Sequence, residues 1–329
     1  MWEKTTPAVF GIRLIQRTLL ENKEGSALRI SLILPLRFSR NVQAIKDNFV
    51  IMGKQFLSLF FALGFCACHA QTSLSTKLEE QKIFPLGVVE TIHSTVLSED
   101  RVLNIYLPDG YKKDVDSSYP VIYLLDGSAN EDFIHIVGLV QFLTMIGAMP
   151  NTIVVGIANV DRRRDFTFPT TIGKDKKDYP TTGSSGKFML FIEKELEPYI
   201  IKNYRCNTSK TIIGQSLGGL FATEVLLRKP FLFNNYIIVS PSLWWDNESL
   251  LSLAPGLLKL PGDSHIHAYV SVGSEGKQME DDAKKLVAIL QSQPNQKIKV
   301  DFVPLPDENH LTILHISVYK ALEILNAKK

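Results

Sequence analysis

A chain of 329 residues with 45% apolar side chains is long enough for one large α/β domain or two small ones, and it contains no repeat or low-complexity tract. Its slight excess of positive charge comes from residues 1–70, which hold nine Lys/Arg and four Asp/Glu, against 27 and 30 in the remainder. The body of the chain therefore lacks the basic footprint of a nucleic-acid-binding protein.

The first 70 residues have the pattern of a leader. A short positive region begins at Met52, an apolar run follows over 56–68, and Ala70 completes a small-residue cleavage pattern. This layout is typical of a secretory signal peptide spanning 52–70, and the apolar run is too short for a transmembrane helix. We therefore expect an exported protein, periplasmic or secreted, with no stable membrane insertion, and we expect residues 1–51 to be untranslated or a disordered leader.

The cysteines leave an alternative to signal cleavage. A lipid anchor on Cys66 or Cys68 would hold the mature protein at a membrane, and a third interpretation places the apolar run in a buried segment. Removal of a signal peptide leaves Cys206 as the single cysteine. An exported form of the chain is therefore expected to contain no internal disulfide.

Beyond the leader, segments typical of strands and helices follow one another. Alternating residues over 88–96 and 101–107 predict an antiparallel pair, and the continuous apolar run 119–125 predicts a central strand buried on both faces. The other expected elements are the helix 133–149, the strand 152–158, a polar loop over 161–186, the helix 187–204 bent at Pro198, the strand 211–213, the helix 220–228, the strand 236–240, a turn bearing Trp244 and Trp245, the strand 266–272, the helix 279–290, the strand 298–303 and the helix 311–325. Because strands alternate with helices, we expect a single domain over 80–329 with a mostly parallel, eight-stranded sheet and helices on both faces, the α/β-hydrolase fold.

The pentapeptide 214–218 (GQSLG) stands between the β-branched run 211–213 and the expected helix 220–228. In such a strand–turn–helix unit, the central Ser216 takes a strained backbone conformation, and small residues two before and two after it let neighbouring chain pass close by. Its hydroxyl then lies at a helix N-terminus, where backbone N–H groups favour developing negative charge. The pattern predicts that Ser216 is a nucleophile.

A serine hydroxyl needs a base that accepts its proton, and the base needs a third group that holds its tautomer. In this fold the three follow in the order serine, acid, histidine, each at the C-terminal end of a strand. His310 meets this rule because it lies in a polar loop between the last strand and the last helix, and His315 is the fallback. His265 and His267 lie at the entry of their strand, which is the wrong end.

The acid is expected after the strand 266–272. Glu275 occupies the C-terminal end of that strand and is the first candidate. Glu280 and Asp281 begin the next helix and are alternatives, although a favourable interaction with the helix dipole explains them without any catalytic role. A Ser-His dyad without a strong acid is the third alternative.

The oxyanion that forms when the serine attacks needs two preorganised N–H donors. The fold supplies one from the residue after the nucleophile, here Leu217, and one from the loop after the third strand, here Gly127 or Ser128. The Asp126-Gly127 pair forms a turn in either case, and the functional prediction adds only that its amide points at the site.

Several motifs resemble those of the esterase family that includes esterase D, feruloyl esterases, mycolyltransferases and ferric-siderophore esterases. They are YLLDG at 123–127, RDFT at 164–167, GQSLGGLF at 214–221, SPSLWW at 240–245 and ENH at 308–310. The resemblance spans about 85–326 and implies hydrolysis of a carboxylic ester through an acyl-enzyme, with no metal or organic cofactor. Gln215 departs from the family, in which His is frequent at this position, and contacts beside the serine are expected to change.

The double-Trp segment and the Arg-Asp loop most resemble the enterobactin, bacillibactin and fusarinine esterases. Trp244 and Trp245 could stack on catecholates or sugars, and Arg163 or Arg164 could pair with a carboxylate or an anionic ferric chelate. The alternative is that one Trp packs in the core and the Arg side chains are solvated. The expected partner is a small-molecule ester such as a ferric siderophore. An acetyl or feruloyl esterase acting on polysaccharide, and a non-catalytic binding protein on a hydrolase scaffold, are the other hypotheses.

Overall fold

The computed structural model describes residues 82–113, 117–258, 260, 265–292 and 298–327. The chain from Lys82 onward forms one compact unit. The expectations for 1–51 and for the signal peptide at 52–70 lie outside the described residues. Within the described ranges, no helix combines the length and apolar character needed to span a membrane.

Eight strands form one sheet in the order β1-β2-β4-β3-β5-β6-β7-β8. The strands are β1 (Val88–Ser94), β2 (Glu99–Tyr106), β3 (Tyr119–Leu124), β4 (Ile153–Ile157), β5 (Cys206–Gln215), β6 (Asn235–Val239), β7 (Ile266–Gly273) and β8 (Ile298–Leu305). The β1–β2 and β2–β4 pairs are antiparallel, and the remaining five are parallel. The predicted eight-stranded, mostly parallel sheet is therefore confirmed.

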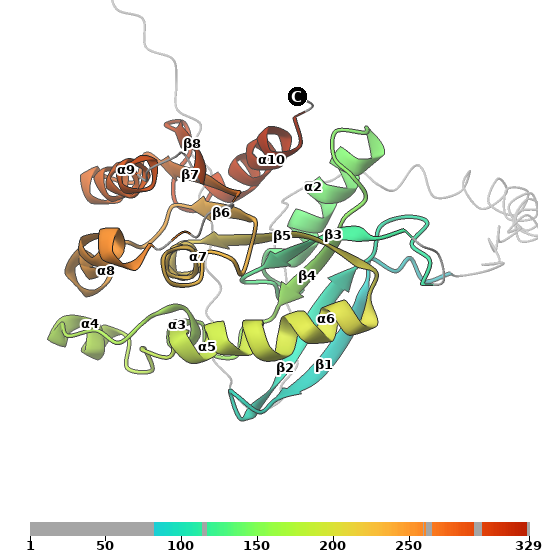
Figure 1. Cartoon of the computed structure of the whole chain (residues 1–329), viewed down its shortest axis with the longest axis horizontal. Helices are drawn as coiled ribbons and strands as arrows, with labels where there is room; N and C mark the ends of the chain where they lie inside the picture. The colour runs from blue at the N-terminus through green and yellow to red at the C-terminus, as the bar shows by residue number, and fades with distance from the viewer. Residues whose placement is uncertain (1–81, 114–116, 259, 261–264, 293–297, 328–329) are drawn as a thin grey trace, which may run out of the picture. The chain divides into compact units, whose positions relative to one another are not determined.

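Helices cover both faces of this sheet (Figure 1). The helices are α2 (Phe133–Met145), α3 (Arg162–Phe166), α4 (Gly173–Asp178), α5 (Ser185–Phe191), the π-helical η2 (Ile192–Leu196), α6 (Glu197–Asn203), α7 (Leu217–Arg228), α8 (Trp245–Leu257), α9 (Lys277–Gln291) and α10 (Ile313–Asn326). Helices α2 and α10 pack on one face, and α5 to α9 pack on the other. The central strand shows why the run 119–125 has no polar face, because Val121 and Tyr123 enter one core while Ile122 and Leu124 enter the other.

Three segments differ from the sequence-based expectation. The expected loop 161–186 contains the short helices α3 and α4, and the expected turn at Trp245 opens α8. The helix expected over 187–204 is present, but its middle changes to π-helical hydrogen bonding in η2 just before Pro198. Proline lacks an N–H and clashes with the carbonyl four residues before it, so the helix has to adjust its hydrogen bonds at this point.

Candidate active site

Ser216 lies at a sharp turn between β5 and α7. Its backbone angles are φ 59° and ψ −119°, a conformation that costs energy for any residue with a side chain. The turn is tight, because a Cβ atom added to Gly214 would lie 2.3 Å from the carbonyl oxygen of Gly218. Only glycine fits there, which explains the small residue two positions before the serine. The serine therefore stands at the N-terminus of α7, immediately before the first helical residue.

His310 and Glu275 meet at the same end of the sheet. Glu275 follows β7, His310 follows β8, and Ser216 follows β5, so all three leave the C-terminal ends of parallel strands. His310 Nδ1 lies 2.5 Å from Glu275 Oε2. The structure thus brings His310 together with the first of the acid candidates. The alternatives Glu280 and Asp281 lie on α9, where Asp281 forms an ion pair with Lys277.

The Glu275 carboxylate is held in its ionised form. Burial raises its pKa, but hydrogen bonds from His310, from the Ser240 hydroxyl and from the Gly273 N–H outweigh burial, so that the pKa lies below its ordinary value. Its side chain is 3% exposed, whereas the His310 side chain is 40% exposed. A buried carboxylate therefore holds an imidazole that is still accessible to solvent.

Ser216 and His310 line one open cleft of about 350 Å³. The lining residues are Asp126, Glu131, Asp132, Arg162, Gln215, Ser216, His310 and Leu311. Ser216 Oγ lies 3.3 Å from the hydroxyl of the buried Ser242, whose N–H donates to the Ser216 carbonyl. The Gln215 amide donates to the His310 carbonyl at 2.5 Å, so this side chain ties the serine turn to the histidine loop.

Of the two backbone N–H groups after β3 that were expected to bind the oxyanion, the one of Gly127 already donates a hydrogen bond within the protein. The Gly127 N–H donates to the carbonyl of Ile157 at 3.0 Å, and an added Cβ would lie 2.4 Å from Gly156. Gly127 therefore serves the contact with β4, and the expectation that its amide faces the substrate is corrected. The Ser128 N–H makes only a long contact of 3.4 Å with Glu131, and Leu217 begins α7, so both remain candidates.

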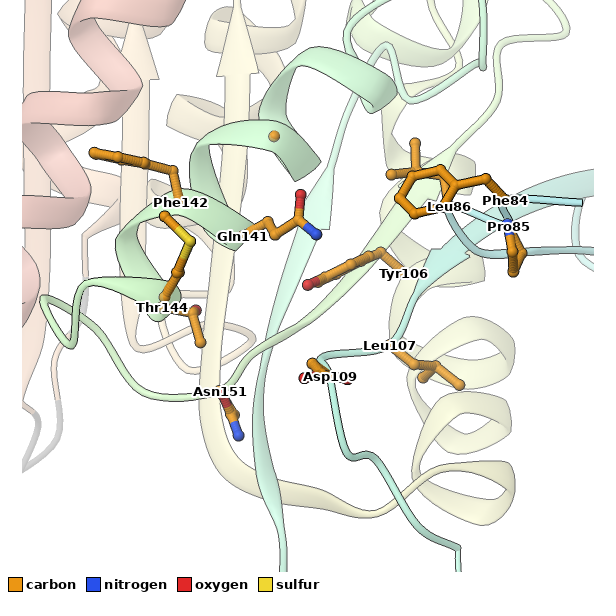
Figure 2. A pocket seen from close by; sticks show the side chains of 12 residues that line it. Phe84, Pro85, Leu86, Tyr106, Leu107, Asp109, Gln141, Phe142, Thr144 and Asn151 are labelled. Atoms are coloured by element: carbon orange, nitrogen blue, oxygen red, sulfur yellow. The ribbon is translucent and has the colours of Figure 1, made fainter. Parts of the chain in front are cut away.

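A larger hollow, of about 770 Å³, lies at the opposite end of the strands from Ser216. Figure 2 shows the side chains that line it. Side chains of α2, including Gln141 and Phe142, line one side, Phe84 and Leu86 line the other, and Tyr106 lies between them. This hollow is formed beside the N-terminal end of β4, whereas Ser216 follows the C-terminal end of the parallel strand β5. Ser216 and His310 therefore line a cleft that is smaller than this hollow.

Comparison with known proteins identifies the family. The family model described as Putative esterase matches residues 94–311. The chain belongs to this esterase family. The chain is 30% identical over 274 residues to the ferri-bacillibactin esterase BesA of Bacillus subtilis, with 77% of this chain and 94% of that protein covered.

Two solved structures share this fold at similar sequence identity. An IroE-like serine hydrolase from Shewanella oneidensis superposes with a TM-score of 0.67 at 30% identity, covering 73% of this chain and 80% of its own. The BES protein from Bacillus cereus gives a TM-score of 0.65 at 29% identity, covering 76% of this chain and 99% of its own. The α/β-hydrolase fold and the carboxylic ester hydrolase class are therefore both established for this chain.

The arginine that reaches the esterase cleft is Arg162, which the sequence analysis did not select. Arg164 was expected to bind substrate, but its guanidinium is bidentate on Glu99, at 2.9 and 2.6 Å, and its Nε donates to Asp165. Arg162 instead lies in the cleft and pairs with Asp126 through two hydrogen bonds of 2.6 and 2.9 Å. The expectation for Arg164 is corrected, because the register of the short helix α3 points its three consecutive arginines in different directions.

The two tryptophans of the esterase have different environments. Trp245 was expected to bind substrate, but it is fully buried and its Nε1 donates to the Phe168 carbonyl at 2.9 Å. That expectation is corrected, and the alternative that one Trp packs in the core holds for Trp245. Trp244 is half-buried and its ring lies 6.2 Å from that of Tyr179. Since Trp244 follows Ser242 by two positions, it remains a candidate for substrate contact.

Alanine substitutions at the two tryptophans should therefore have separate effects. Trp245→Ala is expected to lower the free energy of unfolding by about 3–5 kcal/mol, because it leaves a cavity and an unpaired carbonyl in the core. Trp244→Ala is expected to cost less stability and to raise KM for an aromatic ester. Urea unfolding and steady-state kinetics on both variants measure the two effects, and equal losses of stability would contradict this assignment.

The acidic wall of the esterase cleft contains a carboxyl with a raised pKa. Burial, together with the nearby Asp126 and Glu131, raises the pKa of Asp132 to about 6. In the unfolded chain this group titrates near its ordinary value of 3.8. Ionised Asp132 therefore opposes folding, so that the contribution of this one group to stability falls as pH rises from about 4 to 6 and is not regained at higher pH.

Asp132→Asn should remove this loss of stability. The variant is expected to have a higher Tm than wild type at pH 8 and a similar Tm at pH 4, because the side chain of this helix-capping residue makes no capping hydrogen bond that Asn would lose. Thermal unfolding at both pH values measures the difference. Asp307→Asn, at an exposed position, serves as the control, and a lower Tm for Asp132→Asn at pH 8 would refute the prediction.

Proposed function

We propose that the esterase hydrolyses the ester bonds of a siderophore through an acyl-enzyme formed on Ser216. The observation that carries the proposal is the 2.5 Å contact between His310 Nδ1 and Glu275 Oε2 beside Ser216. The named activity of the Bacillus subtilis relative, aligned over 94% of its length, supports a siderophore as the substrate.

Each of the three side chains has a distinct role in the proposed reaction. Glu275 holds the His310 proton on Nδ1, so Nε2 accepts the Ser216 proton while Oγ attacks the ester carbonyl carbon. His310 then passes this proton to the leaving alkoxide, and the acyl group stays on Ser216. A water then gives a proton to His310 and attacks the acyl-enzyme; the bond between the acyl carbon and Oγ breaks, His310 returns the proton to Ser216 Oγ, and the carboxylic acid is released. The N–H groups of Leu217 and Ser128 are the proposed donors to the oxyanion.

The charges that line the cleft favour one orientation of a bound substrate. Arg162 is matched by Asp126, and Glu131 adds further negative charge on the same wall, which would repel an anionic ferric chelate. A cationic and aromatic cluster formed by Arg163, Tyr179 and Trp244 offers the opposite environment. The Arg163 guanidinium lies 5.0 Å over the Tyr179 ring, which in turn packs beside Trp244. We propose that the chelate end of the substrate contacts this cluster while the ester carbonyl lies at Ser216.

The substrate assignment is tested by comparing kcat/KM for ferri-bacillibactin, an acetylated xylo-oligosaccharide and a short p-nitrophenyl ester. A siderophore esterase is expected to prefer the ferric trilactone. Preference for the oligosaccharide would reject the siderophore and keep the esterase mechanism. Covalent labelling by a fluorophosphonate, lost in Ser216→Ala, distinguishes both outcomes from a non-catalytic binding protein.

Export of the esterase is proposed on the signal-peptide pattern at 52–70 alone. The expected mature N-terminus is Gln71. N-terminal sequencing of the protein recovered from the periplasm or medium measures this directly, and a mature start within 1–51 would refute both the signal peptide and the proposed start of translation at Met52.

A further inference from the structure

Two histidines that the ester chemistry does not use face each other across the seam between α2 and α10. The rings of His135 on α2 and His315 on α10 have centroids 5.2 Å apart and planes inclined by 82°. The two helices lie side by side on the same face of the sheet (Figure 1). Both side chains are exposed, so each ring can turn about its own side-chain bonds.

The pair stands next to the ester cleft without belonging to it. His135 lies three residues after Asp132, which caps the N-terminus of α2 and lines the cleft. Positions three and four apart on a helix are neighbours about one turn along its axis. Within the described part of the chain, neither imidazole makes a hydrogen bond or ion pair that would compete for its nitrogen atoms.

The spacing of the rings matches that of two imidazoles on one metal ion. Zinc binds histidine nitrogen at about 2.0–2.1 Å with tetrahedral angles, which places the centres of two coordinated rings about 5 Å apart. Coordination leaves each ring free to rotate about its metal–nitrogen bond, so steeply inclined planes are compatible with a shared ion. Among the described residues no group of three His, Cys, Asp or Glu side chains is arranged around a metal position, so water would complete the coordination shell.

The donor atoms of the pair decide which metal ions it suits. Imidazole nitrogen suits borderline ions such as Zn²⁺, Ni²⁺ and Cu²⁺, whereas hard ions such as Mg²⁺ prefer oxygen.

We propose that His135 and His315 together form a site for a borderline divalent transition-metal ion at the α2–α10 seam, beside the mouth of the ester cleft. The site needs both rings, because one exposed imidazole binds such ions only weakly. It is independent of the proposed siderophore activity, and a test by thermal stability does not depend on any ester substrate.

The test is the thermal unfolding of the full chain with and without ZnCl₂, with MgCl₂ as the hard-ion control. An ion that binds only the folded chain is expected to raise Tm by about 5 °C at a hundredfold excess over its Kd. The shift should be lost in His135→Ala and in His315→Ala. It should persist in His93→Ala, which removes an exposed histidine that pairs with Asp100 on the β1–β2 hairpin.

Four outcomes would overturn the proposal. The first is the absence of a zinc shift in the wild-type protein. The second is a shift that survives in either His135→Ala or His315→Ala, because the proposed site needs both rings. The third is a shift that is lost only in His310→Ala, which would place the ion in the cleft. An equal response to Mg²⁺ would likewise assign binding to the carboxylates of the cleft wall.

Discussion

Replacing Ser216 by alanine is expected to lower kcat/KM for a p-nitrophenyl ester by about 10⁶-fold, because no other group would form the acyl-enzyme. The hydroxyl makes one long hydrogen bond, to Ser242 Oγ at 3.3 Å, so its removal should cost little stability. The fold should therefore remain intact, with Tm close to that of wild type. Steady-state kinetics and thermal unfolding on the same preparation measure both quantities.

Ser242→Ala is the matched control for this substitution. It removes a hydroxyl from the same contact and leaves the Ser242 N–H that donates to the Ser216 carbonyl. The expected loss in kcat/KM is tenfold or less, because one neutral hydrogen bond usually contributes about 1 kcal/mol. If Ser242→Ala lost as much activity as Ser216→Ala, or if Ser216→Ala kept its activity, Ser216 would not be the nucleophile.

The elements that hold the candidate site were predictable because each carries a local signal. The run 119–125 is apolar at every position, since β3 contributes alternate residues to two different cores. Gly214 is required by a backbone contact, and this requirement is visible in the sequence as part of the GQSLG pattern. His310 and Glu275 were found by chain order, because parallel strands bring their C-terminal ends to one edge of the sheet.

The surroundings of the arginine and tryptophan side chains were not predictable, because they depend on side-chain direction rather than on chain order. Arg162 and Arg164 are two residues apart on a five-residue helix, and only the three-dimensional register shows which of them reaches the cleft. Trp244 and Trp245 are adjacent, and their side chains point in different directions. Trp245 enters the core, whereas Trp244 is half-buried. Gly127 was misassigned because its amide is used by a neighbouring strand, a pairing that the sequence does not specify.

Glu275→Gln is expected to reduce kcat/KM by about 10⁴-fold, because an amide can donate to His310 Nδ1 and stabilise the tautomer that carries its proton on Nε2. That tautomer cannot accept the Ser216 proton. Glu280→Gln, on the first turn of α9, removes a carboxylate of the same size outside the contact and should leave kcat/KM unchanged. A loss below tenfold in Glu275→Gln would instead indicate a Ser-His dyad.

The effect of Glu275→Gln on thermal stability should also depend on pH. The pKa of Glu275 is lowered in the folded chain, so its ionised form adds stability above the ordinary pKa near 4.5, and this contribution is lost as pH falls through the folded value. Glu275→Gln removes the contribution at every pH. The difference in Tm between wild type and variant should therefore be larger at pH 7 than at pH 3. A difference independent of pH would mean that the carboxylate charge does not hold His310, and the orienting role assigned to Glu275 would fall with it.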